Sequence, residues 1–330
     1  MTRHPVTLQD IEAARARIAD RIVRTPLVRS PSLSEATGAP VSLKLEQRQT
    51  TGSFKLRGAT NALASLAPDA KARGVVGAST GNHGRGLAHA AAAEGVRCIV
   101  CMSALVPANK VDGIRALGAE IRIVGRSQDD AQVEVDRLVA EEGLTMVPPF
   151  DHPAIIAGQG TIGLELVEDA PDLDLVLVPL SGGGLAAGIA AAVKGRRPEA
   201  RVVGVSMERG AAMHASLAAG RPTLVEEVPT LADSLGGGIG LENRYTFPMI
   251  RDLLDDVVLL SEEEIAAAIR HAYRHEQEIV EGAGAVGIGA LLARKVEVRG
   301  PTVAVLSGRN IDMEMHRRIV SGEPITLGGN

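Results

Sequence analysis

A lysine in an unusual setting is the first residue that could do chemistry in this sequence. The chain uses lysine sparingly, so such a position stands out. The 35 basic side chains include six lysines, and one of them, Lys55, lies between Phe54 and the start of an apolar helical pattern. An amine can lose its proton and form a Schiff base with a carbonyl group, whereas a guanidinium stays charged. We therefore interpret Lys55 as a candidate nucleophile. An ordinary exposed surface lysine is the alternative interpretation.

A glycine-rich loop is the second feature that could do chemistry. Residues 181–188 read Ser-Gly-Gly-Gly-Leu-Ala-Ala-Gly; they follow an apolar run at residues 173–180 and open a helical pattern. Consecutive glycines let backbone N–H groups converge on one point, and a helix N-terminus adds a positive dipole end, so the loop suits a phosphate group. No lysine follows the glycines, which excludes a nucleoside-triphosphate P-loop. A tight strand-to-helix turn is the alternative.

A polar loop at residues 79–84, Ser-Thr-Gly-Asn-His-Gly, lies between an apolar run and a helical pattern. Polar side chains and exposed backbone amides at a helix N-terminus suit a carboxylate. A simple N-cap turn made by Thr80 or Asn82 is the alternative. A further series at residues 282–287 matches the dinucleotide fingerprint G-x-G-x-x-G, but it follows a helical pattern and not a strand. We interpret this series as a packing turn between helices.

Short apolar runs alternate with alanine-rich helical patterns along the chain. The runs that read as strands are residues 41–45, 74–78, 96–102, 121–124, 173–180, 201–205, 257–260 and 301–306. The clearest helical patterns are residues 84–94, 128–142, 155–168 and 262–279, and capping boxes begin helices after Thr7 and Ser261. This alternation predicts a mostly parallel sheet covered by helices, with ligands bound on the loops at the carboxyl ends of the strands.

The composition excludes several classes of protein. The 330 residues carry a net charge of −5 and are 45% hydrophobic, which is typical of a globular protein of about two domains. The negative charge argues against nucleic acid as a partner. Residues 175–193 are uncharged, but Pro179 and the glycines after it would break a membrane-spanning helix. The first residues lack the apolar region of a signal peptide, so we predict a cytoplasmic protein with no membrane partner.

The two cysteines, Cys98 and Cys101, lie within one of the expected strands. Positions three apart in a strand point to opposite faces of the sheet. We therefore interpret the pair as buried thiols, with a redox or metal pair as the alternative.

Taken together, the three loops resemble the fold-type II pyridoxal-phosphate (PLP) enzymes of the threonine/serine dehydratase family. Residues 51–58, Thr-Gly-Ser-Phe-Lys-Leu-Arg-Gly, look like the cofactor-lysine signature of that family. Residues 79–84 look like its substrate-carboxylate loop, and residues 181–185 look like its phosphate loop. Similar motifs follow in the family's order at residues 149–153, 157–161, 236–241, 281–284 and 307–310.

The resemblance implies an α/β fold like that of the tryptophan synthase β-subunit. Such a fold has two three-layer α/β/α domains with parallel sheets, and the cofactor PLP lies in the cleft between them. In this sequence, residues 50–149 would form the small domain, and residues 1–49 with 150–330 would form the large PLP-binding domain.

The resemblance also implies roles for individual residues. Lys55 would bind PLP covalently and later remove the Cα proton of the substrate, and Thr80 would be a second catalytic residue. The residues implied to bind the cofactor are Phe54, Lys55, Asn82, Gly182, Gly183, Gly184, Leu185, Gly238 and Ser307. The residues implied to bind an amino-acid substrate are Ser79, Thr80, Gly81, Asn82, His83 and Arg309.

These roles predict an ammonia-lyase that eliminates water from a β-hydroxy α-amino acid, such as threonine or serine, to give a 2-oxo acid and ammonia. The Ser307 hydroxyl would not keep the pyridine nitrogen protonated as a carboxylate would, which favours β-elimination over reactions that need a stronger electron sink. Residues 307–312 look like the branch of the family associated with hydroxyectoine utilisation. By resemblance we expect a homodimer or homotetramer.

The sequence departs from its relatives at several positions. Relatives with a divalent-metal site carry Glu after a Gly-Val pair, whereas here Ser206 follows that pair and only Glu208 offers a nearby carboxylate. We therefore expect no divalent metal, and a monovalent ion stays open. By resemblance, Ala131 stands where some relatives carry an arginine that binds a second carboxylate, which disfavours a dicarboxylic substrate.

Three other functions stay open at this point. Thr80 stands where racemases of the family place Ser, so a PLP-dependent amino-acid racemase is the first alternative. A nicotinamide oxidoreductase that uses the glycine-rich loops is the second. A non-catalytic binding protein on the same scaffold is the third.

Overall fold

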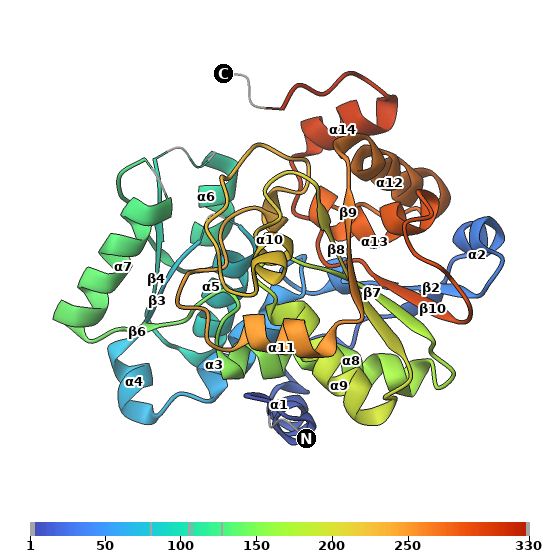
Figure 1. The fold of residues 1–330 in the computed structure, drawn as a ribbon. Helices are drawn as coiled ribbons and strands as arrows, with labels where there is room; N and C mark the ends of the chain where they lie inside the picture. Colours follow the sequence, from blue (N-terminus) through green and yellow to red (C-terminus); the bar gives the residue numbers. More distant parts are fainter. Residues whose placement is uncertain (1–3, 80, 105, 107, 127, 328–330) are drawn as a thin grey trace.

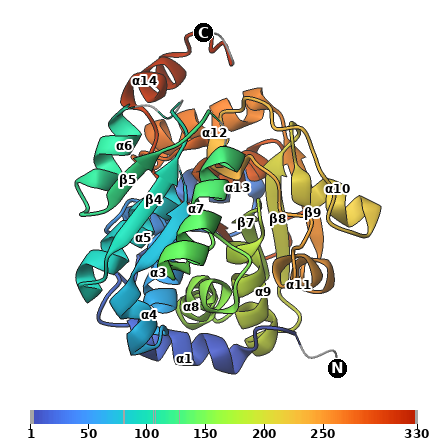
Figure 2. The same ribbon diagram turned by 90° about the vertical axis from the view of Figure 1, so that its left-hand side faces the viewer.

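The computed structural model describes residues 4–79, 81–104, 106, 108–126 and 128–327. They form two β-sheets side by side, each covered by helices, as Figure 1 and Figure 2 show. All the described strand pairs are parallel except β1 with β2, which is antiparallel. The six-stranded sheet has the order β1 (Leu27–Arg29), β2 (Val41–Lys44), β10 (Thr302–Val305), β7 (Leu175–Pro179), β8 (Arg201–Met207), β9 (Asp256–Leu260). The four-stranded sheet has the order β5 (Glu120–Ile123), β4 (Cys98–Met102), β3 (Val75–Ala78), β6 (Thr145–Met146).

Helices cover both faces of the six-stranded sheet. Alternate residues of β7 show why: Leu175 and Leu177 point into one apolar core, whereas Val176 and Val178 point into the other. The first core is closed by α2 (Pro31–Thr37), α12 (Glu262–His275), α13 (Gly282–Leu292) and α14 (Met313–Ser321). The second core is closed by α1 (Leu8–Ile18), α8 (Pro153–Asp169), α9 (Gly184–Arg196) and α11 (Thr246–Leu253). Figure 2 shows α1 running beneath α8 and α9.

The four-stranded sheet is also covered on both faces. On one face its core is closed by α3 (Lys55–Ala64), α5 (Asn82–Glu94) and α6 (Ala108–Arg115), and on the other by α7 (Gln128–Glu142). The remaining elements are short: η1 (Glu46–Arg48), α4 (Pro68–Arg73), α10 (Ala212–Ala219) and η2 (Asp233–Leu235). The arrangement confirms the predicted α/β class with parallel sheets covered by helices.

The two cysteines show the expected alternation within β4. Cys98 packs in the core beneath α5, and Cys101 packs in the core beneath α7. Both are free thiols, and burial raises the pKa of Cys98 to about 12 and that of Cys101 to about 11. The prediction of buried thiols is confirmed.

The predicted strands agree with the observed ones to within two residues at each end, and both capping boxes are confirmed. The helix predicted over residues 262–279 ends earlier, at His275. The interpretation of residues 282–287 as a packing turn is wrong, because they form the first turns of α13. Glycine is required there because the helix passes close to another segment: a Cβ on Gly284 would lie 2.5 Å from the carbonyl oxygen of Gly308.

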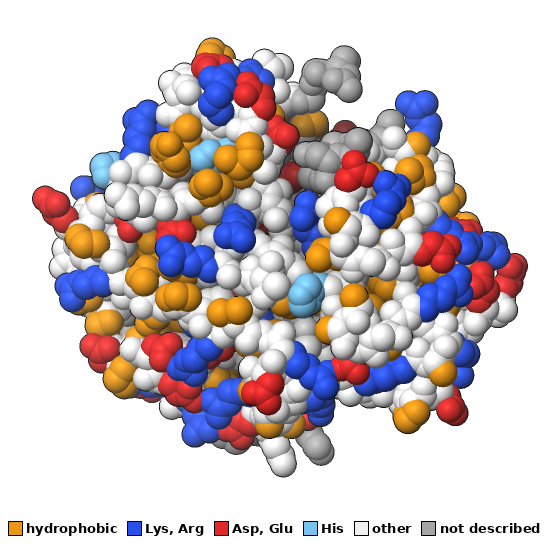
Figure 3. Space-filling model, turned by 180° about the vertical axis from the view of Figure 1, so that it is seen from behind, with side chains coloured by type: hydrophobic (Ala, Val, Ile, Leu, Met, Phe, Trp, Pro, Cys, Tyr) orange, Lys and Arg blue, Asp and Glu red, His pale blue; other side chains and the backbone are white. Residues whose placement is uncertain are grey.

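The uncharged stretch 175–193 forms β7, the glycine loop and most of α9, as predicted. None of the helices in the described part of the chain is long and apolar enough to cross a membrane. Basic and acidic side chains are interspersed over the face shown in Figure 3.

Candidate functional site

Lys55 is the first residue of α3, and its amine reaches the loop that precedes α8. The Nζ atom donates a hydrogen bond to the carbonyl oxygen of Pro149 at 2.8 Å, and it lies 5.3 Å from the centroid of the Phe54 ring. Burial lowers the pKa of the Lys55 amine to about 8, and the charge of Glu281 opposes this shift. At neutral pH a larger share of the amine is therefore uncharged than in an ordinary lysine, as nucleophilic attack on a carbonyl requires.

The glycine loop connects β7 to α9 and presents unused hydrogen-bond donors. Gly183 has φ of +91°, a left-handed conformation that favours glycine. A Cβ on Gly182 would lie 2.4 Å from the Phe150 ring, so only glycine fits there. The backbone N–H groups of residues 182–185 find no acceptor among the described residues. They surround the N-terminus of α9, so this loop can bind a phosphate.

Residues 149–151 bring the amine and the glycine loop together. The carbonyl of Pro149 accepts the hydrogen bond from Lys55, and the Phe150 ring packs on the glycine loop. Asp151 accepts hydrogen bonds from the backbone N–H groups of Tyr245 and Thr246, at 2.9 and 2.8 Å, where α11 begins. In the sequence, residues 149–153 are visible as a motif similar to the family's, but the motif does not indicate what these residues do.

The polar loop joins β3 to α5, and Ser79 holds its shape. The Ser79 Oγ accepts hydrogen bonds from the N–H groups of Gly84 at 2.9 Å and Gly81 at 3.3 Å. His83 Nε2 donates to the carbonyl of Val147 at 2.8 Å, and burial lowers the His83 pKa to about 4, with the charge of Lys55 acting in the same direction. His83 is therefore neutral at pH 7 and its Nε2 is engaged. Thr80 lies outside the described residues.

A buried cluster of Glu281, Asn82 and Asn310 joins this loop to two others. Asn82 Nδ2 donates to Glu281 Oε1 at 2.7 Å, and the backbone N–H of Asn310 donates to Glu281 Oε2 at 3.0 Å. Asn310 Nδ2 donates to Asn82 Oδ1 at 2.5 Å. Burial raises the pKa of Glu281 to about 7, and the charge of Asp233 adds to the shift. Neither Glu281 nor Asn310 is a site candidate from the sequence, although both lie in motifs, residues 281–284 and 307–310, that resemble those of the family.

The segment that carries Ser307 runs along the segment that carries Lys55. The Phe54 N–H donates to the Ser307 carbonyl at 3.0 Å, and the Arg309 N–H donates to the Gly52 carbonyl at 2.9 Å. Ser53 and Gly308 form a β-bridge between these two hydrogen bonds. Ser307 is buried. The structure thus brings Phe54, Lys55 and Ser307 together.

Arg57, two residues after Lys55, fixes the first turn of α3 in a buried cluster of charges. Its guanidinium donates to Glu46 at 2.8 and 2.9 Å and to Glu165 at 2.7 and 3.0 Å. Lys44 Nζ donates to Glu165 at 2.5 Å. Burial alone would lower the pKa of Arg57, but the two carboxylates raise it above its ordinary value, so the guanidinium stays charged. Two cations and two anions therefore balance beneath the candidate site.

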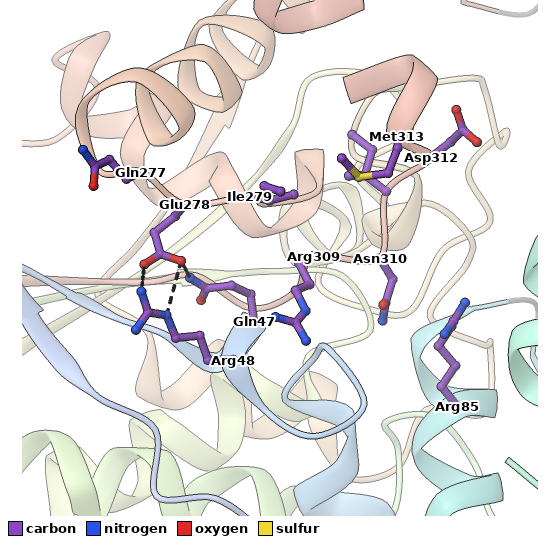
Figure 4. A pocket seen from close by; sticks show the side chains of 11 residues that line it. Gln47, Arg48, Arg85, Gln277, Glu278, Ile279, Arg309, Asn310, Asp312 and Met313 are labelled. Carbon is purple, nitrogen blue, oxygen red and sulfur yellow. Dashed lines mark hydrogen bonds and ion pairs between the residues drawn. The ribbon is translucent and has the colours of Figure 1, made fainter. Parts of the chain in front are cut away.

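Two predicted residues lie apart from this group. The side chain of Arg309 is exposed, and Figure 4 shows it in a pocket of about 500 Å³ together with Gln47, Arg48 and Glu278. Gly238 lies in the long loop between η2 and α11, where the nearest atom to an added Cβ is the Gly240 nitrogen at 3.9 Å. No described contact places either residue against Lys55.

The family model described as "Pyridoxal-phosphate dependent enzyme" matches residues 18–308 of this chain. The chain belongs to the pyridoxal-phosphate dependent enzyme family. A relative from Sinorhizobium fredii named "Putative threonine dehydratase" is 66% identical, over 96% of this chain and 96% of its own length. An "L-threonine ammonia-lyase" from Thermotoga maritima is 43% identical, over 96% of this chain and 78% of its own length.

A solved structure of the same fold is titled "Structure of maize serine racemase". It has a TM-score of 0.91 and 31% identity, and the match covers 97% of this chain and 98% of the maize chain. The predicted family, the fold-type II class and the cofactor PLP are confirmed by these matches. PLP therefore replaces the nicotinamide alternative.

The residues of this PLP-dependent enzyme fit its cofactor. The four unpaired N–H groups at residues 182–185 suit the phosphate, and the Lys55 amine, with its lowered pKa, suits the aldehyde. Two further buried hydroxyl groups, on Thr51 and Ser53, have no hydrogen-bond partner among the described residues. Buried polar atoms without partners are rare in folded proteins, and here they lie four and two residues before Lys55 in the chain.

Proposed function

We propose that this PLP-dependent enzyme is a dehydratase that eliminates water from a β-hydroxy α-amino acid, such as threonine or serine, and releases a 2-oxo acid and ammonia. The observation that carries the proposal is the Lys55 amine, whose pKa is lowered to about 8 and which is joined through residues 149–150 to the glycine loop. The names of the two relatives, a threonine dehydratase and an L-threonine ammonia-lyase, support this class of reaction.

The side chains then take the following roles. PLP supplies a carbonyl group that binds amines and a ring that withdraws electrons from Cα. Lys55 would hold the cofactor, and its Nζ would accept the Cα proton of the substrate, for which a neutral amine is needed. Ser79 shapes the polar loop, so that the backbone at Gly81 and the N-terminus of α5 can bind the substrate carboxylate.

The remaining contacts hold the cofactor. The N–H groups of Gly182, Gly183, Gly184 and Leu185 would bind the phosphate. Phe54 would flank the ring, and the Asn82 amide would bind the phenolic 3′-oxygen. The Ser307 hydroxyl would bind the pyridine nitrogen as a neutral partner, and the ring would then be the weaker electron sink that suits elimination.

We also propose the division into a small domain at residues 50–149 and a large domain at residues 1–49 with 150–330. The whole four-stranded sheet and the helices α3 to α7 fall within residues 50–149, and every strand of the six-stranded sheet falls outside them, which supports this division.

Several finer points stay predictions. They are the homodimer or homotetramer, the cytoplasmic location, the link to hydroxyectoine utilisation, and the roles of Thr80, His83, Gly238 and Arg309.

The test combines cofactor binding with product release. The purified protein is loaded with PLP, reduced with borohydride and digested, and the modified peptide is identified by mass spectrometry. We expect PLP on Lys55, and release of 2-oxo acid from at least one of threonine, serine, a hydroxyaspartate and a hydroxylated diaminobutyrate derivative. Lys194→Ala, at a lysine paired with Asp255 on the surface, is the matched control and should keep both properties.

Two results would overturn the proposal. The first is a wild-type protein that binds no PLP. The second is a Lys55→Ala variant that still releases 2-oxo acid at the wild-type rate.

An amino-acid racemase is the second candidate, and the likeness to the maize serine racemase favours it. The two activities separate when the chirality of the remaining amino acid and the release of 2-oxo acid are followed in the same reaction. Racemisation without product release would replace the dehydratase proposal. If both occur, Thr80→Ala should abolish racemisation and spare elimination.

A further inference from the structure

Glu281 is a buried acidic residue that has no role in the proposed reaction. It is 3% exposed and precedes α13 as the N-terminal cap residue. Among the described residues no lysine or arginine forms an ion pair with it; its oxygens are held by neutral groups, Asn82 Nδ2 at 2.7 Å and the N–H of Asn310 at 3.0 Å. A buried carboxylate without a cationic partner destabilises a fold. Its presence in the candidate site therefore indicates a function.

The hydrogen bonds around Glu281 determine which way the Asn82 amide faces. Asn310 Nδ2 contacts the carbonyl oxygen of Thr51 at 3.0 Å, and a carbonyl can only accept, so this atom of Asn310 is the donor. The same Nδ2 therefore donates to Asn82 Oδ1, at 2.5 Å. With its oxygen thus assigned, Asn82 turns Nδ2 toward the acceptor Glu281 Oε1. Two backbone groups, Thr51 C=O and Asn310 N–H, anchor the whole arrangement.

This arrangement leaves the amide with one donor to spare. The Asn82 Nδ2 has two protons, and Glu281 takes one of them. Among the described residues, Nδ2 also donates a hydrogen bond to Ser234 Oγ, at the limiting distance of 3.5 Å. Because a bond of this length is weak, the second proton is available to an oxygen in the candidate site. A flipped amide would instead place two oxygens, Oδ1 of Asn82 and Oε1 of Glu281, against each other.

The charges that face Glu281 come from two other elements. Lys55, on α3, attracts its negative charge, and Asp233, on η2, opposes it. A negative Glu281 makes the stronger acceptor for Asn82 and therefore holds the amide more firmly.

We infer that Glu281 is a positioning residue: it fixes the Asn82 amide so that Nδ2 presents its second proton to the phenolic oxygen of PLP. The inference rests on the proposed function, because it assigns the partner of Asn82 in the cofactor-binding site. It adds a requirement that the proposed function does not make, namely that the effect of Glu281 passes through Asn82.

The test is a double-mutant cycle read by cofactor binding and not by turnover. Apoenzymes of the wild type, Glu281→Gln, Asn82→Ala and the double variant are titrated with PLP, and the visible absorption of bound cofactor is recorded from about pH 6 to about pH 9, on both sides of the Glu281 pKa of about 7. We expect Glu281→Gln to weaken PLP binding about tenfold, as loss of one charge-assisted hydrogen bond would. It should also shift the absorption spectrum and remove the component of its pH dependence near pH 7.

Glu278→Gln is the matched control. Glu278 lies three residues before Glu281 and is also buried, but its partners are Gln47 and Arg48 in the pocket of Figure 4. This variant should bind PLP with the wild-type affinity and spectrum. Asn310→Ala provides a second route to the same answer if Glu281→Gln does not fold, because it removes the donor that orients Asn82. It should produce a shift of the same sign.

The decisive result is the coupling. In the Asn82→Ala background, Glu281→Gln should cause no further loss of PLP affinity. An undiminished tenfold loss in that background, or a Glu281→Gln enzyme with the wild-type affinity and spectrum, overturns the inference while the proposed function stands. A wild-type protein that binds no PLP is a different result, because it overturns the proposed function itself.

Discussion

Replacing Arg57 with methionine should cost this enzyme a large part of its stability. The guanidinium is fully buried and makes paired hydrogen bonds to both Glu46 and Glu165. Methionine has a similar length and no charge, so the change removes the interactions without leaving a large cavity. The two carboxylates then face different situations. Glu165 keeps Lys44 as a cationic partner at 2.5 Å, whereas among the described residues Glu46 keeps only the hydroxyl of Thr25.

The magnitude follows from this stranded carboxylate. Removing one partner of a buried ion pair costs about 3–5 kcal/mol, compared with a total stability of about 5–15 kcal/mol for a typical domain. Glu46→Gln in the same chain removes the stranded charge and should restore part of the lost stability.

The assay is urea unfolding of the wild type, Arg57→Met and Arg57→Met with Glu46→Gln, compared by their midpoints at pH 7. Arg137→Met is the matched control, because Arg137 pairs with Glu134 and Glu141 on the surface. We expect the control to unfold close to the wild-type midpoint. The reasoning is refuted if Arg57→Met unfolds at the wild-type midpoint. It is also refuted if Glu46→Gln restores nothing, since the penalty would then not come from the stranded charge.

Three further outcomes are expected. The rate at which apoprotein incorporates PLP should rise with pH around a midpoint near 8, because the neutral Lys55 amine is the reactive form; a stopped-flow absorption series measures it, and a flat profile contradicts the lowered pKa. Gly182→Ala should weaken PLP binding, because its Cβ would lie 2.4 Å from the Phe150 ring, and Phe150→Ala in the same chain should relieve the loss; spectrophotometric titration tests both, and a loss that persists contradicts the steric cause. Cys98 and Cys101 should resist a thiol-reactive dye until the protein is unfolded, because burial raises both thiol pKa values; rapid labelling of the native protein would show that the thiols are accessible.

The central strands of both sheets could be predicted because they are buried on both faces. Such strands read as short apolar runs, and those of β7 and β4 are visible in the sequence without any knowledge of their neighbours. The loops of the candidate site could be found for a related reason. Glycines and small polar residues directly after a buried strand add little to an apolar core. Residues 79–84 and 181–184 can therefore be recognised as candidate binding loops.

The contacts between those loops could not be predicted. Asn82 and Glu281 are 199 positions apart in the chain, and the local sequence around either residue does not predict their contact. The charge cluster around Arg57 has the same origin, because its carboxylates come from η1 and α8. The helix over residues 282–292 was missed because glycine has a poor helix propensity, and here close packing outweighs it.

Helix α13 passes so close to residues 307–310 that Gly284 and Gly308 cannot be replaced without a steric clash. A side chain at Gly284 would meet the Gly308 carbonyl, and one at Gly308 would meet the Glu281 carboxylate at 2.6 Å. In a saturation-mutagenesis screen, Gly284 and Gly308 should tolerate no other residue, although neither has a side chain with which to take part in the reaction.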